Sequence, residues 1–361
     1  MALDSYVSLG RSGLKVSPFG LGTAPFGGDG GTGCDVEESE KILQAYIDRG
    51  GNHIDTANFY TNGHSEKVIG DFLAQRPGLR DRIVLGTKFF GNLHVGDPNG
   101  GGAGRKAVID QLEQSLRRLQ TDYIDLYWLH NHDWSTPVEE TLRALDDLVS
   151  AGKVRYVGFS NTPGWFTAQA HTIALLRGWT PVAAIEVEYS LLARTVEGEL
   201  IPLAQDTGMG VVPWSPLKNG FLGGKYARHV APGPAVGEAR ALMGVPSDSQ
   251  YEVIEAVAAI AEEIGVSSAA VALAWLRSRP GVSSILVGAR RLDHLDNSLT
   301  AFDVTLTPAQ TAALDEVSAP ALNYPAGVPQ QFAPMLKYAG ATVDGRRTTV
   351  YPPLLASPTR Y

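Results

Sequence analysis

The sequence predicts an α/β protein, a (β/α)8 TIM barrel with an N-terminal β-hairpin and an irregular C-terminal tail. Helix and strand patterns alternate from residue 37 to about 301, and each of eight short strands is followed by a helical pattern. The strands are apolar on both faces, as expected of a parallel sheet covered by helices. A doubly wound sheet gives the same alternation. However, no Gly-x-Gly-x-x-Gly follows a predicted strand, and this absence favours the barrel.

The elements follow from local patterns, in order along the chain. Two apolar pairs flank the turn at residues 10–13 and predict a hairpin, 7–16, which we expect to plug the N-terminal end of the barrel. Helices are identified by apolar residues at a spacing of 3.6, and strands by short β-rich runs. The predicted strands are Phe19–Leu21, Asn52–Asp55, Ile83–Thr87, Tyr123–His130, Val154–Phe159, Val182–Val187, Gly210–Pro213 and Ser284–Val287. The predicted helices are Glu37–Arg49, Ser65–Ala74, Arg105–Leu119, Val138–Ser150, Trp165–Leu176, Glu199–Asp206, Glu252–Ile264, Ala269–Arg277 and Asp293–Ala301.

We interpret residues 1–361 as one domain, with a barrel at about 19–301 and a C-terminal extension at about 302–361. From residue 320 the tail is rich in Pro, Gly and aromatic residues, a composition compatible with folding over the barrel mouth and also with mobility. Long loops rich in Gly or Pro follow strands, on the face where barrel enzymes keep their sites: Gly27–Gly33, Asn92–Gly104 and Ser215–Ser247.

Composition narrows the class of partner. The net charge of -8 and pI near 5.5 give no electrostatic reason to expect a nucleic acid or an anionic membrane. The N-terminus lacks the pattern of a signal peptide, and apolar runs are far shorter than the roughly 20 residues that span a bilayer. A single cysteine, Cys34, cannot form an internal disulfide. We therefore expect a cytoplasmic enzyme with a small-molecule substrate, and the oligomeric state stays open.

Four ionisable residues fall at successive strand ends. Asp55 ends one strand and Tyr60 follows it by five residues, while Lys88 and His130 end the next two strands. In a barrel these ends are neighbours, so we expect the four side chains to converge. An adjacent ammonium makes a phenol a better proton donor, and Asp55 would hold that ammonium in place. The set suits protonation of a carbonyl oxygen while a hydride reaches its carbon.

Other interpretations exist for the same residues. Taken singly, Asp55 could cap a helix, Tyr60 and Lys88 could be rim residues, and His130 could be a core histidine. His130 and His132 on one face could also chelate a metal, but no further histidine arrives at a strand end. Four acid/base groups at the same end of consecutive strands favour a functional site without a metal.

Several segments in order resemble the aldo-keto reductase superfamily, in particular its bacterial aryl-alcohol-dehydrogenase-like branch. The resemblance runs from about residue 6 to 320. Its motifs are NHIDTANFY at 52–60, GTK at 86–88, DYIDLYWLH at 122–130, GKVRYVGFSN at 152–161, EYSLLAR at 188–194, PWSPL at 213–217, GGKY at 223–226 and VGARR at 287–291.

The resemblance implies an NADPH-dependent reductase of aldehydes or ketones, with reverse alcohol oxidation possible. It implies a catalytic tetrad of Asp55, Tyr60, Lys88 and His130, in which Tyr60 is the acid. It also implies a coenzyme site in which NADP is preferred and NAD is possible. The implied coenzyme contacts are Ser160, Asn161 and Glu186 to the carboxamide, Trp214 to the nicotinamide ring, Ser215, Leu217, Gly220 and Lys225 to the diphosphate, and Gly288, Arg290, Arg291, His294, Asn297 and Ser298 to the adenosine end.

Some positions depart from the family's pattern. Glu186 stands where the family usually has Gln, and His294, Asn297 and Ser298 stand where many relatives carry Gln, Glu and Asn. An arginine fork suits a 2′-phosphate better than a hydroxyl, which supports NADP. The alternative function is an NADPH-binding regulatory subunit with little turnover, as in channel-associated relatives. We also expect an apolar or aryl substrate, because aromatic residues are available to line the mouth: Phe26, Phe59, Phe90, Trp128 and Trp134.

Overall fold

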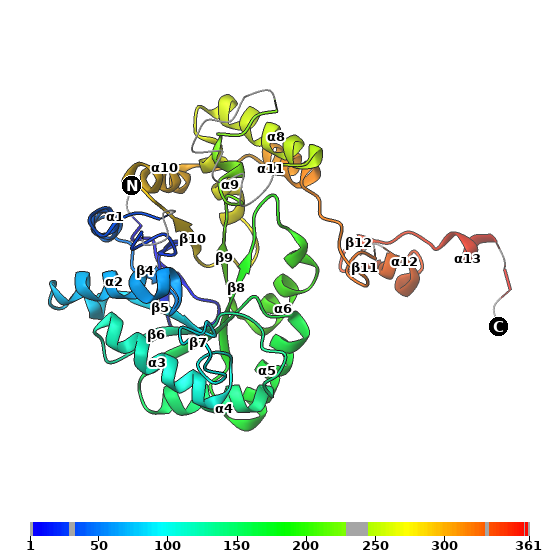
Figure 1. Cartoon of the computed structure of the whole chain (residues 1–361). Coiled ribbons are helices and arrows are strands. Elements are labelled where there is room, and N and C mark those ends of the chain that lie inside the picture. The colour runs from blue at the N-terminus through cyan, green and yellow to red at the C-terminus, as the bar shows by residue number, and fades with distance from the viewer. Residues whose placement is uncertain (1–2, 29–32, 229–244, 329–331, 357, 360–361) are drawn as a thin grey trace.

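The computed structural model describes residues 3–28, 33–228, 245–328, 332–356 and 358–359. Eight parallel strands form a nearly closed barrel surrounded by helices, which confirms the predicted fold (Figure 1). Their order around the barrel is β10-β3-β4-β5-β6-β7-β8-β9. The strands are β3 (Phe19–Gly22), β4 (His53–Asp55), β5 (Val84–Phe89), β6 (Ile124–Leu129), β7 (Val154–Ser160), β8 (Val182–Glu188), β9 (Gly210–Trp214) and β10 (Ile285–Gly288).

The helices cover the outside of the barrel. Most agree with the predicted ranges to within two residues. The described helices of the barrel region are α1 (Val36–Asp48), α2 (His64–Ala74), α3 (Arg105–Leu119), α4 (Val138–Ser150), α5 (Gly164–Arg177), α6 (Leu200–Thr207), α8 (Asp248–Ile264), α9 (Ser268–Arg277), α10 (Leu292–Leu299) and α11 (Pro308–Val317). Short 3-10 turns are η1 (Tyr60–Gly63), η2 (Arg80–Arg82), η3 (Thr195–Gly198), η4 (Phe221–Gly223) and η5 (Thr300–Asp303).

Helix α8 begins four residues before the predicted start at Glu252. Ser247 accepts a hydrogen bond from the Gln250 amide, and the Gln250 side chain accepts one from the Ser247 amide, forming a capping box. Thr307 and Gln310 form the same motif at the start of α11, a helix that the sequence reading omitted. At the starts of α8 and α11, the capping residues are polar and precede the apolar residues whose spacing identifies the helix.

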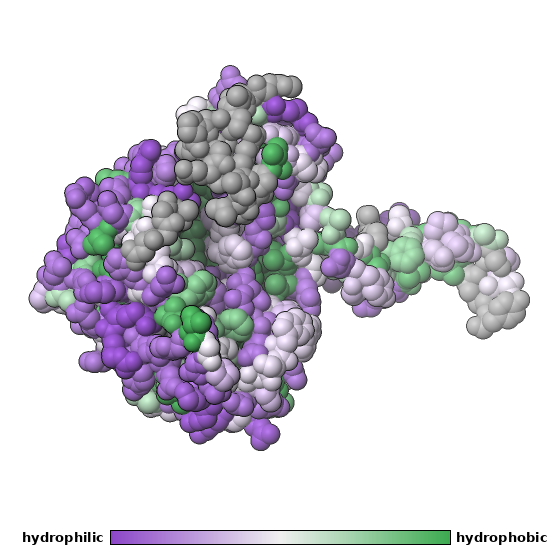
Figure 2. Space-filling model, in the orientation of Figure 1, coloured by the Kyte–Doolittle hydropathy of each residue, from purple (hydrophilic) through white to green (hydrophobic). Residues whose placement is uncertain are grey.

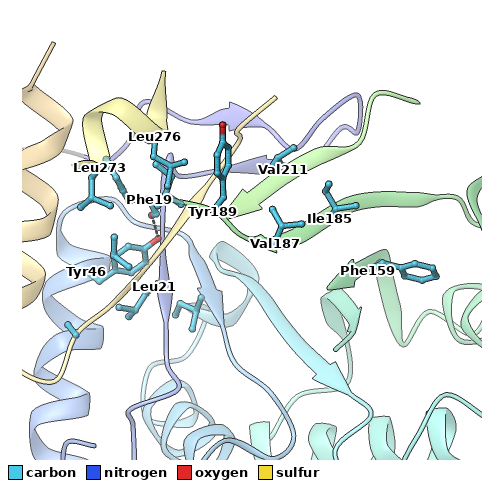
Figure 3. Packing of buried hydrophobic residues seen from close by; sticks show 14 of the residues in the cluster. Phe19, Leu21, Tyr46, Phe159, Ile185, Val187, Tyr189, Val211, Leu273 and Leu276 are labelled. Carbon is cyan, nitrogen blue, oxygen red and sulfur yellow. Dashed lines mark hydrogen bonds between the residues drawn. The ribbon is translucent and has the colours of Figure 1, made fainter. Parts of the chain in front are cut away.

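Side chains along each strand point alternately into the barrel and outward to the helices, and they form two separate apolar cores. Residues that point into the barrel form one apolar cluster, whereas their neighbours point outward to the helices and form a larger one. On the outer side the Tyr46 hydroxyl of α1 donates a 2.8 Å hydrogen bond to the Phe19 carbonyl (Figure 3). The inner cluster consists of Leu9, Val16, Val84, Leu126, Trp128, Ala184, Val212 and Leu286.

The N-terminal hairpin pairs β1 (Val7–Ser8) with β2 (Lys15–Val16) and covers the N-terminal end of the barrel. Leu9 and Val16 are fully buried within the inner cluster, as expected of a plug. The Arg11 amide donates a 2.8 Å hydrogen bond to the Gly208 carbonyl just before β9. The hairpin closes the N-terminal end of the barrel. A ligand site is therefore expected at the opposite end, where the strands finish.

Beyond α11 the chain extends away from the barrel and forms a small unit of its own (Figure 1). It consists of α12 (Phe332–Tyr338), the antiparallel pair β11 (Thr342–Val343) and β12 (Arg346–Arg347), and α13 (Pro352–Ala356). Figure 2 shows apolar residues along this tail, whereas the barrel face in view is mainly hydrophilic. Within the described ranges, no single helix is long and apolar enough to cross a bilayer, although the bent pair α8 and α9 passes that test by length and composition.

Candidate active site

Four side chains meet where β4, β5 and β6 end. Lys88 of β5 donates a hydrogen bond to Oδ2 of Asp55 on β4, and its Nζ lies 3.1 Å from the Thr56 carbonyl oxygen. The same Nζ lies 3.5 Å from the hydroxyl oxygen of Tyr60 on η1. The ring of His130, just after β6, lies edge-on to the Tyr60 ring, with the centroids 5.7 Å apart. The structure thus brings together the four residues that the sequence singled out.

Burial decides the charge of Tyr60. Loss of solvent is the largest effect and raises the pKa of the phenol to about 12, while the Lys88 ammonium acts to lower that pKa. From the sequence we expected the Lys88 ammonium to have the larger effect on the pKa of Tyr60, but burial has the larger effect in this site. Tyr60 therefore keeps its proton at neutral pH.

His130 is held in its neutral form. Burial and then the nearby Lys88 ammonium lower the pKa of the imidazole to about 2. Its Nδ1 is buried and has no hydrogen-bond partner in the described part of the protein. A neutral imidazole can give one N–H hydrogen bond to a substrate oxygen but is no source of a proton at physiological pH.

A second carboxylate reaches Lys88. Oε2 of Glu186, on β8, lies 3.3 Å from Lys88 Nζ, and the Lys88 and Glu186 side chains are 0% and 3% exposed. Burial, reinforced by the neighbouring Asp55 carboxylate, raises the pKa of Glu186 to about 8, in spite of Lys88. Burial acts to lower the pKa of Lys88, but the two carboxylates outweigh it and raise that pKa. Sequence reasoning gave Glu186 a coenzyme contact and missed this charge contact.

The residues expected at the nicotinamide form one hydrogen-bonded chain beside the four acid/base groups. Asn161 Nδ2 donates to Ser160 Oγ at 3.0 Å and to the His130 carbonyl at 2.9 Å. Asn161 Oδ1 accepts from the indole Nε1 of Trp214 at 3.1 Å. Ser160 is buried and pairs with Glu186 across β7 and β8. Three strand ends thus supply a polar corner bounded by an indole.

The loop after β9 turns tightly from its first residue. Ser215 has a φ of 50°, in the left-handed region, and its carbonyl accepts a 2.8 Å hydrogen bond from the Lys218 amide. Leu217 packs against the core, and Gly220 has a φ of 95°, which suits glycine. Lys225 is exposed. Residues 229–244 of the predicted loop Ser215–Ser247 lie outside the described residues, as do 29–32 of the loop at 27–33.

A group of cations gathers near the end of β10. Burial is the main cause that lowers the pKa of His294. The Asp293 carboxylate acts to raise that pKa, and the positive charges of Lys225, Arg291 and Arg290 act to lower it. These three cations therefore lie within electrostatic reach of one imidazole. Such a group fits the phosphates of a dinucleotide.

The two arginines differ in their partners. Arg291 donates two hydrogen bonds to the Asp293 carboxylate, from Nε at 2.8 Å and from a second guanidinium nitrogen. Arg290 is exposed, and among the described residues it has no ion pair. Arg290 is therefore the freer of the two for an external phosphate. Among the described residues, a β-carbon on Gly288 would meet only the Gly22 carbonyl oxygen, at 3.9 Å, so these residues leave room there.

The other two adenosine-end residues lie on α10. Ser298 is buried and donates a 2.9 Å hydrogen bond to the His294 carbonyl, which makes it part of the helix packing. Asn297 is exposed. Of this pair, Asn297 is the one available to a ligand.

Comparison with known proteins identifies the family. A family model described as "Aldo/keto reductase family" matches residues 18–319. The chain belongs to this family.

Three relatives illustrate its range. A Saccharomyces cerevisiae protein with the provisional name aryl-alcohol dehydrogenase is 36% identical over 319 residues, 85% of this chain and 84% of its own length. Norsolorinic acid reductase of Aspergillus flavus is 32% identical over 323 residues, 87% and 81% of the two chains. An Oryza sativa subsp. japonica protein provisionally named a voltage-gated potassium channel subunit beta is 34% identical over 320 residues, 86% and 96% of the two chains. As an aldo/keto reductase, the protein is an NAD(P)H-dependent oxidoreductase that acts on small carbonyl or alcohol compounds.

The aromatic lining of this aldo/keto reductase differs from the one expected. Phe26 and Trp128 are fully buried in the two cores and face no open space, so their assignment to the mouth was wrong. Phe59 is 41% exposed, and its ring centroid lies 5.0 Å from that of His130. Trp134 is 79% exposed, and Phe90 is half-buried.

His132 belongs to an aromatic group at the same end of the barrel. Its ring lies edge-on to Trp134 at 4.2 Å, to Phe166 at 4.3 Å and to Trp165 at 5.7 Å, centroid to centroid. Trp165, at the start of α5, is 54% exposed and was missed as a candidate for the mouth. Across the described residues, no group of three His, Cys, Asp or Glu side chains is placed to hold a metal.

Proposed function

We propose that the protein reduces aldehydes or ketones with NADPH, and that Tyr60 is the general acid. The observation that carries this proposal is the 3.5 Å separation of Lys88 Nζ and the Tyr60 hydroxyl at the open end of the barrel. A protonated phenol beside a fixed ammonium can release its proton to a carbonyl oxygen, because the ammonium stabilises the phenolate left behind.

The coenzyme, when bound, supplies a hydride to the carbonyl carbon. Tyr60 gives its proton to the carbonyl oxygen, so the substrate gains a C–H and an O–H bond and becomes an alcohol. Lys88 balances the charge of the Tyr60 phenolate, and Asp55 holds Lys88 in position through their buried ion pair. His130, being neutral, can orient the carbonyl oxygen by one hydrogen bond. The reverse sequence oxidises an alcohol.

The residues present fit a nicotinamide coenzyme. Ser160 and Asn161 offer polar groups to a carboxamide, and Trp214 offers a flat ring for stacking. Ser215, Leu217, Gly220 and Lys225 would border the diphosphate, while Gly288, Arg290, Arg291, His294, Asn297 and Ser298 would border the adenosine end. The exposed guanidinium of Arg290 supports NADP over NAD, because a guanidinium suits a 2′-phosphate.

The aromatic residues at the mouth of the barrel predict which carbonyl substrates the protein prefers. Exposed rings at Phe59, Trp134 and Trp165 favour apolar or aryl carbonyls. The name of the yeast relative, an aryl-alcohol dehydrogenase, agrees with an aryl substrate. Steady-state kinetics with NADPH and NADH over matched aryl and short aliphatic aldehydes tests the proposal. We expect higher kcat/KM for NADPH and for aryl aldehydes, and no consumption of either coenzyme would contradict it.

A second candidate is a regulatory subunit that binds NADPH with little turnover. It is favoured by the name of the rice relative, a channel subunit beta. The same kinetic panel separates the two functions when it is paired with a binding titration. Tight NADPH binding without consumption would support the regulatory role.

A further inference from the structure

In the barrel interior, two carboxylates contact the same ammonium group. Lys88 is hydrogen-bonded to Asp55, and Glu186 Oε2 lies 3.3 Å from the same Nζ, with all three side chains at most 3% exposed. If both carboxylates were ionised, the group would carry one uncompensated negative charge away from water. Such a charge is costly to bury, so one carboxyl group holds a proton until the pH is high enough to remove it.

Among the described residues, the surroundings of Glu186 offer no other charge that could compensate. Of the groups that titrate, Asp55 faces it from β4, Lys88 from β5 and Tyr60 from η1. The neighbouring strands place Ser160 and Val212 opposite it, and neither titrates. Two residues along β8, Glu188 is already paired with Lys218. Loss of the Glu186 proton therefore changes the charge of this pocket by one unit.

The pocket adjoins the proposed nicotinamide corner. Glu186 pairs in register with Ser160, and its carbonyl accepts a 3.2 Å hydrogen bond from the Asn161 amide. A nicotinamide ring is cationic in the oxidised coenzyme and neutral in the reduced one. A negative charge nearby therefore stabilises the oxidised form selectively.

We infer that Glu186 sets the preference of the site between the two redox states of the coenzyme. Its ionised form favours the oxidised coenzyme and alcohol oxidation, and its protonated form favours carbonyl reduction. This inference rests on the proposed function, since it needs a nicotinamide coenzyme at Ser160 and Asn161. It gives Glu186 an electrostatic role that a neutral amide of the same shape would not fill.

The test measures the dissociation constants of NADPH and NADP+ by fluorescence titration between pH 6 and pH 9.5. In the wild type, the ratio of the NADPH constant to the NADP+ constant should rise on the order of tenfold, which corresponds to about 1.4 kcal/mol. The 2′-phosphate is common to both coenzymes and cancels in the ratio. In Glu186→Gln the ratio should be flat.

Glu188→Gln is the matched control, because it removes a carboxylate from the same strand and should keep the wild-type rise. A flat ratio in the wild type, or an unchanged rise in Glu186→Gln, would overturn the inference. The wild-type measurement decides even if a variant fails to fold. Absence of binding of both coenzymes to the wild type would instead contradict the proposed function, and the inference with it.

Discussion

Removal of the Lys88 ammonium should show how much its positive charge stabilises the buried carboxylates of Asp55 and Glu186. Lys88→Met keeps a side chain of similar length but removes the ammonium that contacts the buried Asp55 and Glu186 carboxylates. Loss of one partner of a buried ion pair usually costs about 3–5 kcal/mol, and a shift of one pKa unit corresponds to about 1.4 kcal/mol. At neutral pH we therefore expect the free energy of unfolding to fall by about 3–5 kcal/mol.

The sign of the pH dependence follows from where the protons are. In the folded variant both carboxyl groups have raised pKa values, whereas in the unfolded chain they ionise near their usual values of about 4. The folded state then binds more protons, so the deficit relative to the wild type grows as the pH rises above about 4. Below about pH 4 the folded and unfolded states are both protonated, and this part of the deficit disappears.

Urea unfolding of the wild type and Lys88→Met at pH 5 and pH 8 measures the effect. The double variant Lys88→Met with Glu186→Gln is the control, because one of the two unbalanced carboxyl groups is then neutral, and it should recover part of the loss at pH 8. A deficit that is the same at both pH values, or no recovery in the double variant, would refute the reasoning.

Three further outcomes are expected. Arg290→Ala should weaken NADPH binding more than NADH binding. It should also weaken NADPH binding more than Arg291→Ala does, because Arg291 is already paired with Asp293. Equal losses of NADPH affinity in titrations of the two variants would contradict this. In the proposed mechanism, alcohol oxidation uses the phenolate of Tyr60, whose pKa is raised to about 12. The value of kcat/KM for oxidation should therefore rise between pH 7 and pH 10, by up to about tenfold per pH unit, and a flat profile would argue against Tyr60 as the base. Ser247→Ala should destabilise α8 by about 1 kcal/mol, measured by urea unfolding, whereas an unchanged midpoint would show that the cap contributes little.

Most of the fold could be predicted from the sequence, because alternation of short apolar strands with amphipathic helices reports the covered parallel sheet directly. Helix α4 illustrates this: its apolar stripe gave both ends correctly as Val138 and Ser150. Helix α11 was omitted because its start is marked by Thr307 and Gln310, before any apolar stripe. The four acid/base residues could be placed together because consecutive strands of a barrel are neighbours.

Contacts between distant strands were harder to predict. Position on β8 shows that Glu186 shares a face with Ala184, yet only the three-dimensional arrangement shows that this face reaches Lys88 across the barrel. In the same way, a ring near a strand end can face either the core or the mouth. Trp128 is fully buried and Trp134 is exposed, although they are six residues apart. Net pKa values likewise depend on burial, which a local sequence pattern does not report.

The most direct test of the central claim is Tyr60→Phe, which removes only the phenolic oxygen 3.5 Å from Lys88 Nζ. NADPH binding, measured by fluorescence titration, should stay within a few-fold of the wild type, because the described contacts of the proposed coenzyme site do not involve Tyr60. Turnover of an aryl aldehyde that the wild type reduces should fall by about 100-fold or more, the usual scale for a general acid. Wild-type turnover in Tyr60→Phe would contradict the assignment of Tyr60 as the proton donor.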